Sequence, residues 1–500
     1  MPARTHIRAV ILIVGLSLLG AFAFAGRAGA LVHNGALDIN KAVATEQTIQ
    51  IVRDLHFKRD VGVTVMTPDQ VAKMLAVPKL GDPSDDQIAA EGAAGAMLGL
   101  FPQGIDLKSA SIETLKEQLL AFYDFNTRHM VVIDGGDQSV SSNIELAGER
   151  AGLRDYLGYL ILAHEYTHAL QDQNFHLGEK LRRLREDTDA ELALRSVAEG
   201  DATLAGWGYV LGKMDVGTVQ MLESDVKTFT KDYTLHPKGG SLAAYEYFNF
   251  PYVQGLRFVS EAYKRGGWAA VDALYRDPPE STAQIMEPSL YFDHRTRPLE
   301  VDLYGYDPML DGWQMVESDT SGELALQVIL ERNLGVNSRE ITPAFEWAGD
   351  RLALFRRNGE IGALWLIAFR DQSSARSFAA TYKRVLDRVL GSRTPRLVES
   401  RDSAVLVIAG APARISGLAA SVWKSSVIAV PQPRDLTASV DLDDAAADVP
   451  RRRQSSPAES AGFVDRVKQI IRRLAASQSK PLFESGKDGK DNQGDPDLLP

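Results

Sequence analysis

Two long segments with few helix breakers occupy the middle of the chain, at residues 154–173 and 185–211. Neither contains proline, and only a short linker at 174–180 separates them, so we expect two consecutive long helices. A β-branched run at 130–133, ended by Gly135 and Gly136, predicts a short strand. The expected fold class is therefore α+β and predominantly helical.

Shorter patterns predict further elements along the first 340 residues. Thr67 followed by Pro68 is a helix start signal, with threonine as the N-cap and proline in the first turn. We also expect helices at 41–55, 115–122, 216–231 and 323–332, one short helix within 81–104, helical structure from 245–252 to about residue 276, a strand at 57–66, and an irregular region from 278 to about 312.

The first long helix carries the sequence His-Glu-Tyr-Thr-His at 164–168. Positions four apart lie on one face of a helix, so His164 and His168 can hold one metal ion together. Glu165 lies about 100° around the helix from His164, where its carboxylate can take a proton from a metal-activated water. The chain has no cysteine, so histidines and carboxylates must hold any transition metal. We predict zinc as the cofactor, His164 and His168 as ligands and Glu165 as the general base.

A catalytic zinc usually takes three protein ligands, so this pair needs a third. Glu199 is the preferred candidate, because it lies midway along the second long helix with small residues on its face at 196, 202, 203 and 206. These small residues would let the second helix approach the first. Asp172, one turn beyond His168, and His176, past the end of that helix, stay open as alternatives. So does Asp201, which we otherwise expect to bond a neighbouring segment.

His164-Glu165-x-x-His168 with a downstream helical Glu199 resembles the gluzincin metallopeptidases, the thermolysin-like branch of the zincin fold. Residues 164–173 and 199–203 are also similar to a group of uncharacterised secreted bacterial and archaeal HExxH proteins. Short segments at 121–124, 281–285 and 348–351 look like further pieces of that group's pattern. The resemblance implies a zinc cofactor, a site of two histidines and one glutamate, and hydrolysis of a peptide bond. One position departs from the thermolysin pattern, since Thr203 stands where an aspartate would orient the first histidine.

A peptidase also needs a hydrogen-bond donor for the negative charge that develops on the carbonyl oxygen. The candidates are Tyr245, Tyr247, Tyr252 and His129, and their spacing selects none of them. By analogy with the zincin fold, the strand at 130–133 would be an edge strand that aligns an extended peptide substrate.

The N-terminus has the order of a secretory signal. Arg4 and Arg8 precede an apolar run at 9–25, and small residues at 28–30 offer a cleavage site. We expect residues 1–30 to be a signal peptide and the protein to be exported, whether periplasmic, secreted or at the cell surface. An uncleaved membrane anchor is the alternative. The net charge of −11 gives no reason to expect nucleic acid as a partner.

Three further regions follow the signal. We expect a zincin-like metallopeptidase domain at 31–340, a small α/β module at 341–430 and a mostly disordered tail at 431–500. Within the module, strands are expected at 351–355, 363–368 and 404–408, and helices at 373–389 and 411–422. The expected function is an exported zinc-dependent metallopeptidase acting on a peptide or protein. A non-catalytic exported metal-binding or scaffold protein is the alternative, and the oligomeric state stays open.

Overall fold

The computed structural model describes residues 32–33, 36–76, 84–118, 121–134, 154–220, 222–223, 242–306, 312–335, 338–410, 415–431 and 436. Every described residue belongs to the unit Met1–Ala446. The predicted signal peptide at 1–30, most of the predicted tail at 431–500 and part of the helix predicted at 216–231 lie outside the described residues.

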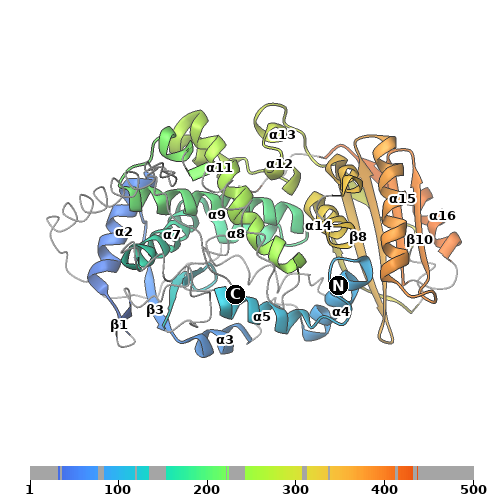
Figure 1. Ribbon diagram of the computed structural model, residues 1–500, viewed down its shortest axis with the longest axis horizontal. Coiled ribbons are helices and arrows are strands. Elements are labelled where there is room, and N and C mark those ends of the chain that lie inside the picture. The colour runs from blue at the N-terminus through green and yellow to red at the C-terminus, as the bar shows by residue number, and fades with distance from the viewer. Residues whose placement is uncertain are drawn as a thin grey trace, which may run out of the picture. The chain divides into compact units, whose positions relative to one another are not determined.

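The described residues form a helix-rich α+β structure, which confirms the predicted fold class at that level (Figure 1). The helices are α2 (Ile39–Arg53), α3 (Pro68–Ala76), α4 (Asp85–Leu98), α5 (Leu107–Gln118), α7 (Arg154–Phe175), α8 (Leu177–Arg183), α9 (Thr188–Leu211), α11 (Leu242–Arg276), α12 (Thr282–Met286), α13 (Ser289–Phe292), α14 (Gly322–Leu334), α15 (Gln372–Val389), α16 (Ile415–Ser425) and the 3-10 helix η3 (Arg339–Glu346). The strands are β1 (Val32–His33), β2 (Ala36–Leu37), β3 (Gly62–Met66), β4 (Ala121–Asp124), β5 (His129–Ile133), β6 (Glu300–Asp302), β7 (Gln314–Asp319), β8 (Trp347–Arg357), β9 (Glu360–Phe369), β10 (Arg396–Arg401), β11 (Ala404–Ala409) and β12 (Val427–Ala429).

Helix α9 is central to the helical part, because it packs against α2, α7 and α11. Asp187 caps its first turn by accepting a hydrogen bond from the Ala190 amide. Gly212, in the left-handed conformation with φ 69°, ends it. Almost every residue of α9 between these ends is buried, including its charged ones. A helix with neighbours on so many sides can carry a functional side chain deep into the structure.

A three-stranded sheet lies beside α7, with the strand order β3-β5-β4. Strand β5 pairs in parallel with β3 and antiparallel with β4. The strand predicted at 130–133 is therefore present, but the prediction that it is an edge strand is wrong. Both sides of β5 are already hydrogen-bonded to neighbouring strands, so it cannot add a peptide by strand pairing. Within the described residues the edge next to α7 is β4.

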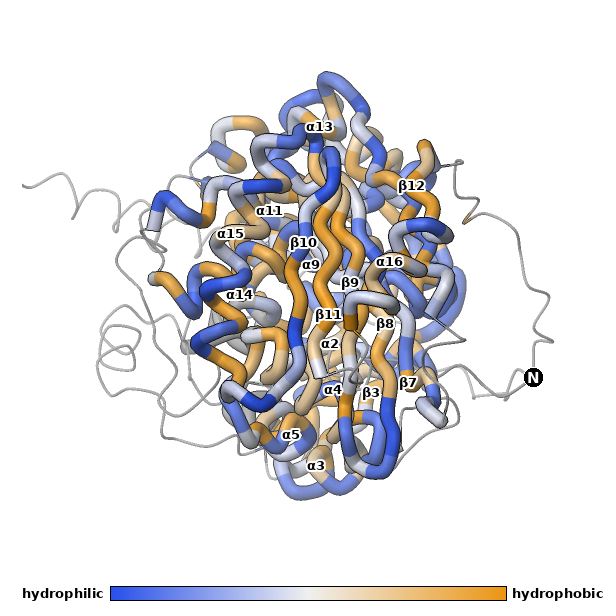
Figure 2. Tube along the Cα trace, turned by 90° about the vertical axis from the view of Figure 1, so that its right-hand side faces the viewer, coloured by the Kyte–Doolittle hydropathy of each residue, from blue (hydrophilic) through white to orange (hydrophobic). Residues whose placement is uncertain are grey.

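The other large sheet is an antiparallel one with the order β10-β11-β9-β8-β7. Alternate residues of β8, β9 and β11 face two separate apolar clusters, one shared with α4, α14 and α15 and the other with α16 and β6. Figure 2 shows the resulting apolar colouring of β8, β9 and β11. Burial on both faces explains why these strands read in the sequence as apolar runs. The three strands and two helices predicted for residues 351–422 are all found.

Several local predictions differ from the structure. The helix predicted at 115–122 ends at Gln118, and the aromatic residues after it form β4. The linker predicted at 174–180 contains the start of α8, and the strand predicted at 57–66 begins only at Gly62. Strands β7 and β10 were not predicted, because edge strands carry charged residues that hide the strand pattern. In the described parts of the chain, no helix has the length and apolar character needed to cross a membrane.

Candidate metal centre

Three side-chain atoms from α7 and α9 meet at one point. The Nε2 atoms of His164 and His168 are 2.9 Å apart, and Glu199 Oε2 lies 3.1 Å from the first and 3.3 Å from the second. Zinc–ligand bonds of about 2.0–2.1 Å in a tetrahedron place neighbouring ligand atoms about 3.3 Å apart. These three side chains could therefore hold a metal ion, and their spacing and donor set are compatible with zinc. Within the described ranges, this is the one group of three or more metal-ligating side chains.

Glycines bring α9 into close contact with both of its long neighbours. A Cβ atom added at Gly206 would lie 3.1 Å from Leu160 Cδ1 of α7. A Cβ added at Gly200 would lie only 2.2 Å from the carbonyl oxygen of Gly255 on α11. Only glycine allows backbones to approach so closely. These close contacts fix the position of Glu199 between α7 and α11. The contact at Gly206 confirms that a small residue lets α9 approach α7.

The three side chains differ in charge. Burial lowers the pKa of His164 to about 3, so its ring is neutral. Burial also lowers the pKa of His168, but the charge of Glu199 and a hydrogen bond to it outweigh burial and raise the pKa to about 9. At Glu199 burial raises the pKa, but the contacts with His168 and His164 hold it at about 2. A metal ion would therefore have to displace one proton, from His168.

Glu165 lies next to these three side chains. Its Oε2 atom accepts a hydrogen bond of 2.9 Å from the backbone N–H of Tyr123 on β4. Its Oε1 atom is buried and has no hydrogen-bond partner. Burial raises the pKa of Glu165 to about 8, although the charge of His168 opposes the shift. One oxygen is thus anchored, while the other can gain or lose a proton without breaking a hydrogen bond.

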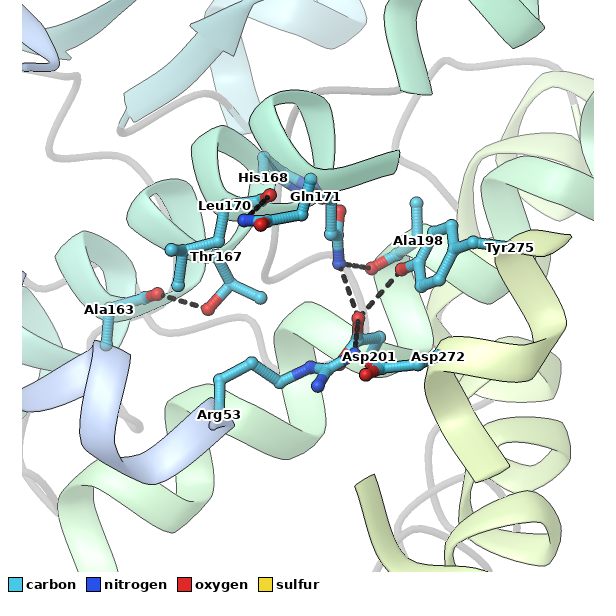
Figure 3. A network of polar contacts seen from close by, with 11 residues as sticks. Arg53, Ala163, Thr167, His168, Leu170, Gln171, Ala198, Asp201, Asp272 and Tyr275 are labelled. Carbon is cyan, nitrogen blue, oxygen red and sulfur yellow. Dashed lines mark hydrogen bonds and ion pairs between the residues drawn. The ribbon is translucent and has the colours of Figure 1, made fainter. Parts of the chain in front are cut away.

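A polar network lies behind His168 (Figure 3). His168 Nδ1 is 2.9 Å from Gln171 Oε1, and the Gln171 amide nitrogen donates to Asp201 Oδ2 at 3.0 Å. Asp201 in turn pairs with the fully buried Arg53 of α2 and accepts a hydrogen bond from Tyr275 of α11. As expected, Asp201 bonds neighbouring segments, and it does not join the three converging side chains.

The other predicted ligands have different roles. Asp172 accepts hydrogen bonds from the Tyr123 hydroxyl and the Gly178 amide. His176 adopts a left-handed conformation with φ 56° between α7 and α8. Neither belongs to the group of ligand atoms at His164. Thr203, at the position of the thermolysin-pattern aspartate, has a buried hydroxyl without a hydrogen-bond partner, so it does not orient a histidine.

The structure separates the four candidate oxyanion donors. The ring of Tyr252 lies 6.4 Å from that of His164, which brings this tyrosine beside the centre. Tyr247 lies instead near a buried acidic group of Asp189, Asp319 and Asp350, whose charges act with burial to raise its pKa. The exposed His129 bonds the Thr127 carbonyl oxygen, and the side chain of Tyr245 lies outside the described residues.

Sequence reasoning did not single out four residues that shape the centre: Gln171, Arg53, Tyr123 and Gly255. Arg53 and Asp201 are 148 positions apart, so no local spacing links them. The available signal was weak and consisted of glycines on two long helices, at Gly200 and Gly255, which indicate close helix crossings.

A domain of unknown function (DUF8575) matches residues 309–439 of the chain. This segment contains the five-stranded sheet with α14, α15 and α16, and the chain is similar to that domain only there. Helices α7 and α9, which carry His164, His168 and Glu199, lie outside the match. No curated protein and no solved structure matches the chain.

Proposed function

We propose that this chain is a zinc-dependent metallopeptidase of the zincin type, with its active centre at His164, His168 and Glu199. One observation carries the proposal: three ligand atoms converge within 3.3 Å of one another beside a buried carboxylate with one unpaired oxygen. A site that only clamps a metal has no use for that carboxylate, Glu165. The reaction class, peptide hydrolysis, comes from the HExxH motif and the resemblance to gluzincins.

The chemistry divides between the ion and the chain. When bound, zinc would act as a Lewis acid and lower the pKa of a water molecule to about 7. His164, His168 and Glu199 would hold the ion. Glu165 would take a proton from the attacking water at Oε1 and pass it to the leaving nitrogen as the peptide C–N bond breaks. Tyr252 is the proposed hydrogen-bond donor to the carbonyl oxygen, because its ring lies beside that of His164.

Export is part of the proposal and rests on residues 1–30. The basic residues, apolar run and small residues of this segment favour a cleaved signal peptide. The N-terminal sequence of the mature protein tests this point, because a cleaved signal would leave a protein that begins near residue 31. An N-terminus at Met1 would favour the membrane anchor instead.

One observation favours the alternative of a non-catalytic metal-binding protein. The exposed fractions of His164, Glu165, His168 and Glu199 are 1%, 0%, 1% and 2%. A peptide would reach Glu165 only after surrounding residues moved. A buried metal that braces α7 against α9 would need no such movement.

Metal content and peptide hydrolysis, measured on the same purified full-length proteins, separate the two functions. The parent should hold about one zinc per chain, and His164→Ala and Glu199→Ala should lose it. Glu165→Gln should keep zinc and lose hydrolysis, because the amide cannot take a proton. Zinc bound without hydrolysis of any peptide in a mixed library would favour the non-catalytic role. A parent that binds no zinc after reconstitution would refute both.

A further inference from the structure

The side-chain amide of Gln171 can lie in only one orientation. Its nitrogen is 2.9 Å from the carbonyl oxygen of Ala198 and 3.0 Å from Asp201 Oδ2. Both of these oxygens only accept hydrogen bonds, so the nitrogen of Gln171, which only donates, must face them. The amide oxygen is therefore left facing His168 Nδ1, 2.9 Å away. An oxygen at this position requires a proton on Nδ1, which leaves Nε2 of a neutral ring without one.

Asp201 is itself held so that its oxygens cannot turn away from Gln171. Arg53 donates from Nε to Oδ1 at 2.6 Å and from Nη2 to Oδ2 at 3.2 Å. The Tyr275 hydroxyl donates to Oδ2 at 2.7 Å, and Arg53 also pairs with Asp272 at 2.6 Å. Figure 3 shows these contacts joining residues from α2, α7, α9 and α11. Arg53 and Asp201 are both fully buried, so water does not compete for the carboxylate.

We propose that Gln171 is the positioning residue for His168, and that Asp201 and Arg53 set the direction of its amide. The relay runs from the Arg53–Asp201 ion pair through Gln171 to Nδ1 of His168, and it keeps Nε2 directed at the point between His164 and Glu199 where a metal would bind. This inference rests on the proposed metal site. In many metal sites the second ring nitrogen of a ligand histidine donates a hydrogen bond to a carboxylate or a carbonyl, and here the acceptor is the side-chain amide oxygen of Gln171 on α7.

The relay explains why Gln171 is more than a structural contact. Without an acceptor at Nδ1, the neutral ring of His168 could place its proton on Nε2 and could rotate, and both changes remove the lone pair from the metal. Gln173 provides the contrast on the same helix. It is also buried, but its side chain bonds the backbone of Lys58 and Arg59, on a segment that carries no metal ligand.

The test compares Gln171→Met with Gln173→Met in the full-length protein. Methionine keeps the length and volume of glutamine and removes its hydrogen bonds, so each variant loses buried polar contacts. The readout is zinc affinity by competition with a chromophoric chelator, with folding checked by circular dichroism. We expect Gln171→Met to lower zinc affinity by about 10–100-fold, and Gln173→Met to leave it unchanged at a comparable loss of stability. Cobalt-substituted Gln171→Met should also show a changed d–d absorption spectrum.

The outcomes separate the positioning role of Gln171 from the proposed metal site. A folded Gln171→Met with parental zinc affinity, or an equal loss in Gln173→Met, would overturn the positioning role while the metal site stands. A parent that binds no zinc would instead overturn the proposed function. If Gln171→Met does not fold, Gln171→Asn replaces it, because the shorter side chain keeps an amide but withdraws it from His168. Parental affinity in Gln171→Asn would count against the relay, and a tenfold or greater loss would support it.

Discussion

Replacing Gly200 with alanine should push α9 and α11 apart and shift Glu199 relative to the two histidines of α7. The added Cβ atom would lie 2.2 Å from the carbonyl oxygen of Gly255 and 2.3 Å from its carbonyl carbon. Favourable non-bonded contacts begin near 3.5 Å, so the helices must separate by roughly 1 Å. Both contacted atoms belong to the backbone, and no change of side-chain conformation can relieve the clash.

The expected cost follows from two opposing effects. Overpacking a buried contact costs about 1–3 kcal/mol of unfolding free energy. Alanine in place of a helical glycine recovers about 0.5–1 kcal/mol, so the unfolding free energy of the zinc-free protein should fall by about 0–2.5 kcal/mol. Metal sites tolerate ligand displacements of about 0.2 Å. A shift of roughly 1 Å at Glu199, the residue before Gly200, should therefore weaken zinc binding by about tenfold or more.

Urea denaturation of zinc-free protein and chelator competition measure the two quantities separately. Gly217→Ala is the matched control, because this helical glycine at 216–220 has open space, with Asp215 Oδ1 at 3.5 Å as the nearest atom to an added Cβ. The unfolding free energy of Gly217→Ala should equal or exceed that of the parent. The reasoning would be refuted if Gly200→Ala proved as stable as Gly217→Ala and kept parental zinc affinity. The double variant Gly200→Ala/Gly255→Ala should lose less unfolding free energy than the two single variants together, because both substitutions separate the same pair of helices.

Three other measurements test the centre and its surroundings. Tyr252→Phe should lower kcat by about 100-fold or more if the Tyr252 hydroxyl stabilises the oxyanion. Tyr247→Phe, on the same helix, should leave kcat unchanged. Equal kcat values in the two variants would exclude Tyr252 as the donor. Because the pKa of His168 is raised to about 9, zinc must displace a proton from this ring below that pH. The zinc affinity should therefore weaken by about tenfold for each pH unit from 8 down to 6. A pH-independent zinc affinity, after correction for chelator protonation, would contradict this. Burial raises the pKa of Asp319 to about 7, so its neutral form stabilises the fold at acidic pH and that contribution is lost as pH rises from about 4 through 7. Between pH 5 and 8 the unfolding free energy of the parent should therefore fall further than that of Asp319→Asn, by on the order of 3 kcal/mol. Identical pH profiles of the two proteins in urea denaturation would argue against the raised pKa of Asp319.

Short-range patterns predicted the elements that hold the chemistry. Histidines four apart on an uninterrupted helix must share a face, because 3.6 residues make one turn. The apolar runs of β8, β9 and β11 similarly predicted strands, which the structure buries on both faces. Asp187 and Gly212 bound α9 through local capping. In each case the physical cause lies within a few residues of its effect. The assignment of zinc and of peptide hydrolysis stays a prediction on this basis.

Contacts between segments far apart in the sequence decided how the residues of the candidate site are brought together and oriented. That Glu199 reaches the histidines depends on α9 lying between α7 and α11, at crossings set by glycines on different helices. The order β3-β5-β4 placed β4, and not β5, at the edge beside Glu165. Arg53 and Asp201 meet across 148 positions of sequence, and through them Gln171 is directed at His168. Such contacts depend on how whole elements pack, and the residues that form them carry no shared local pattern, so only the tertiary structure could reveal them.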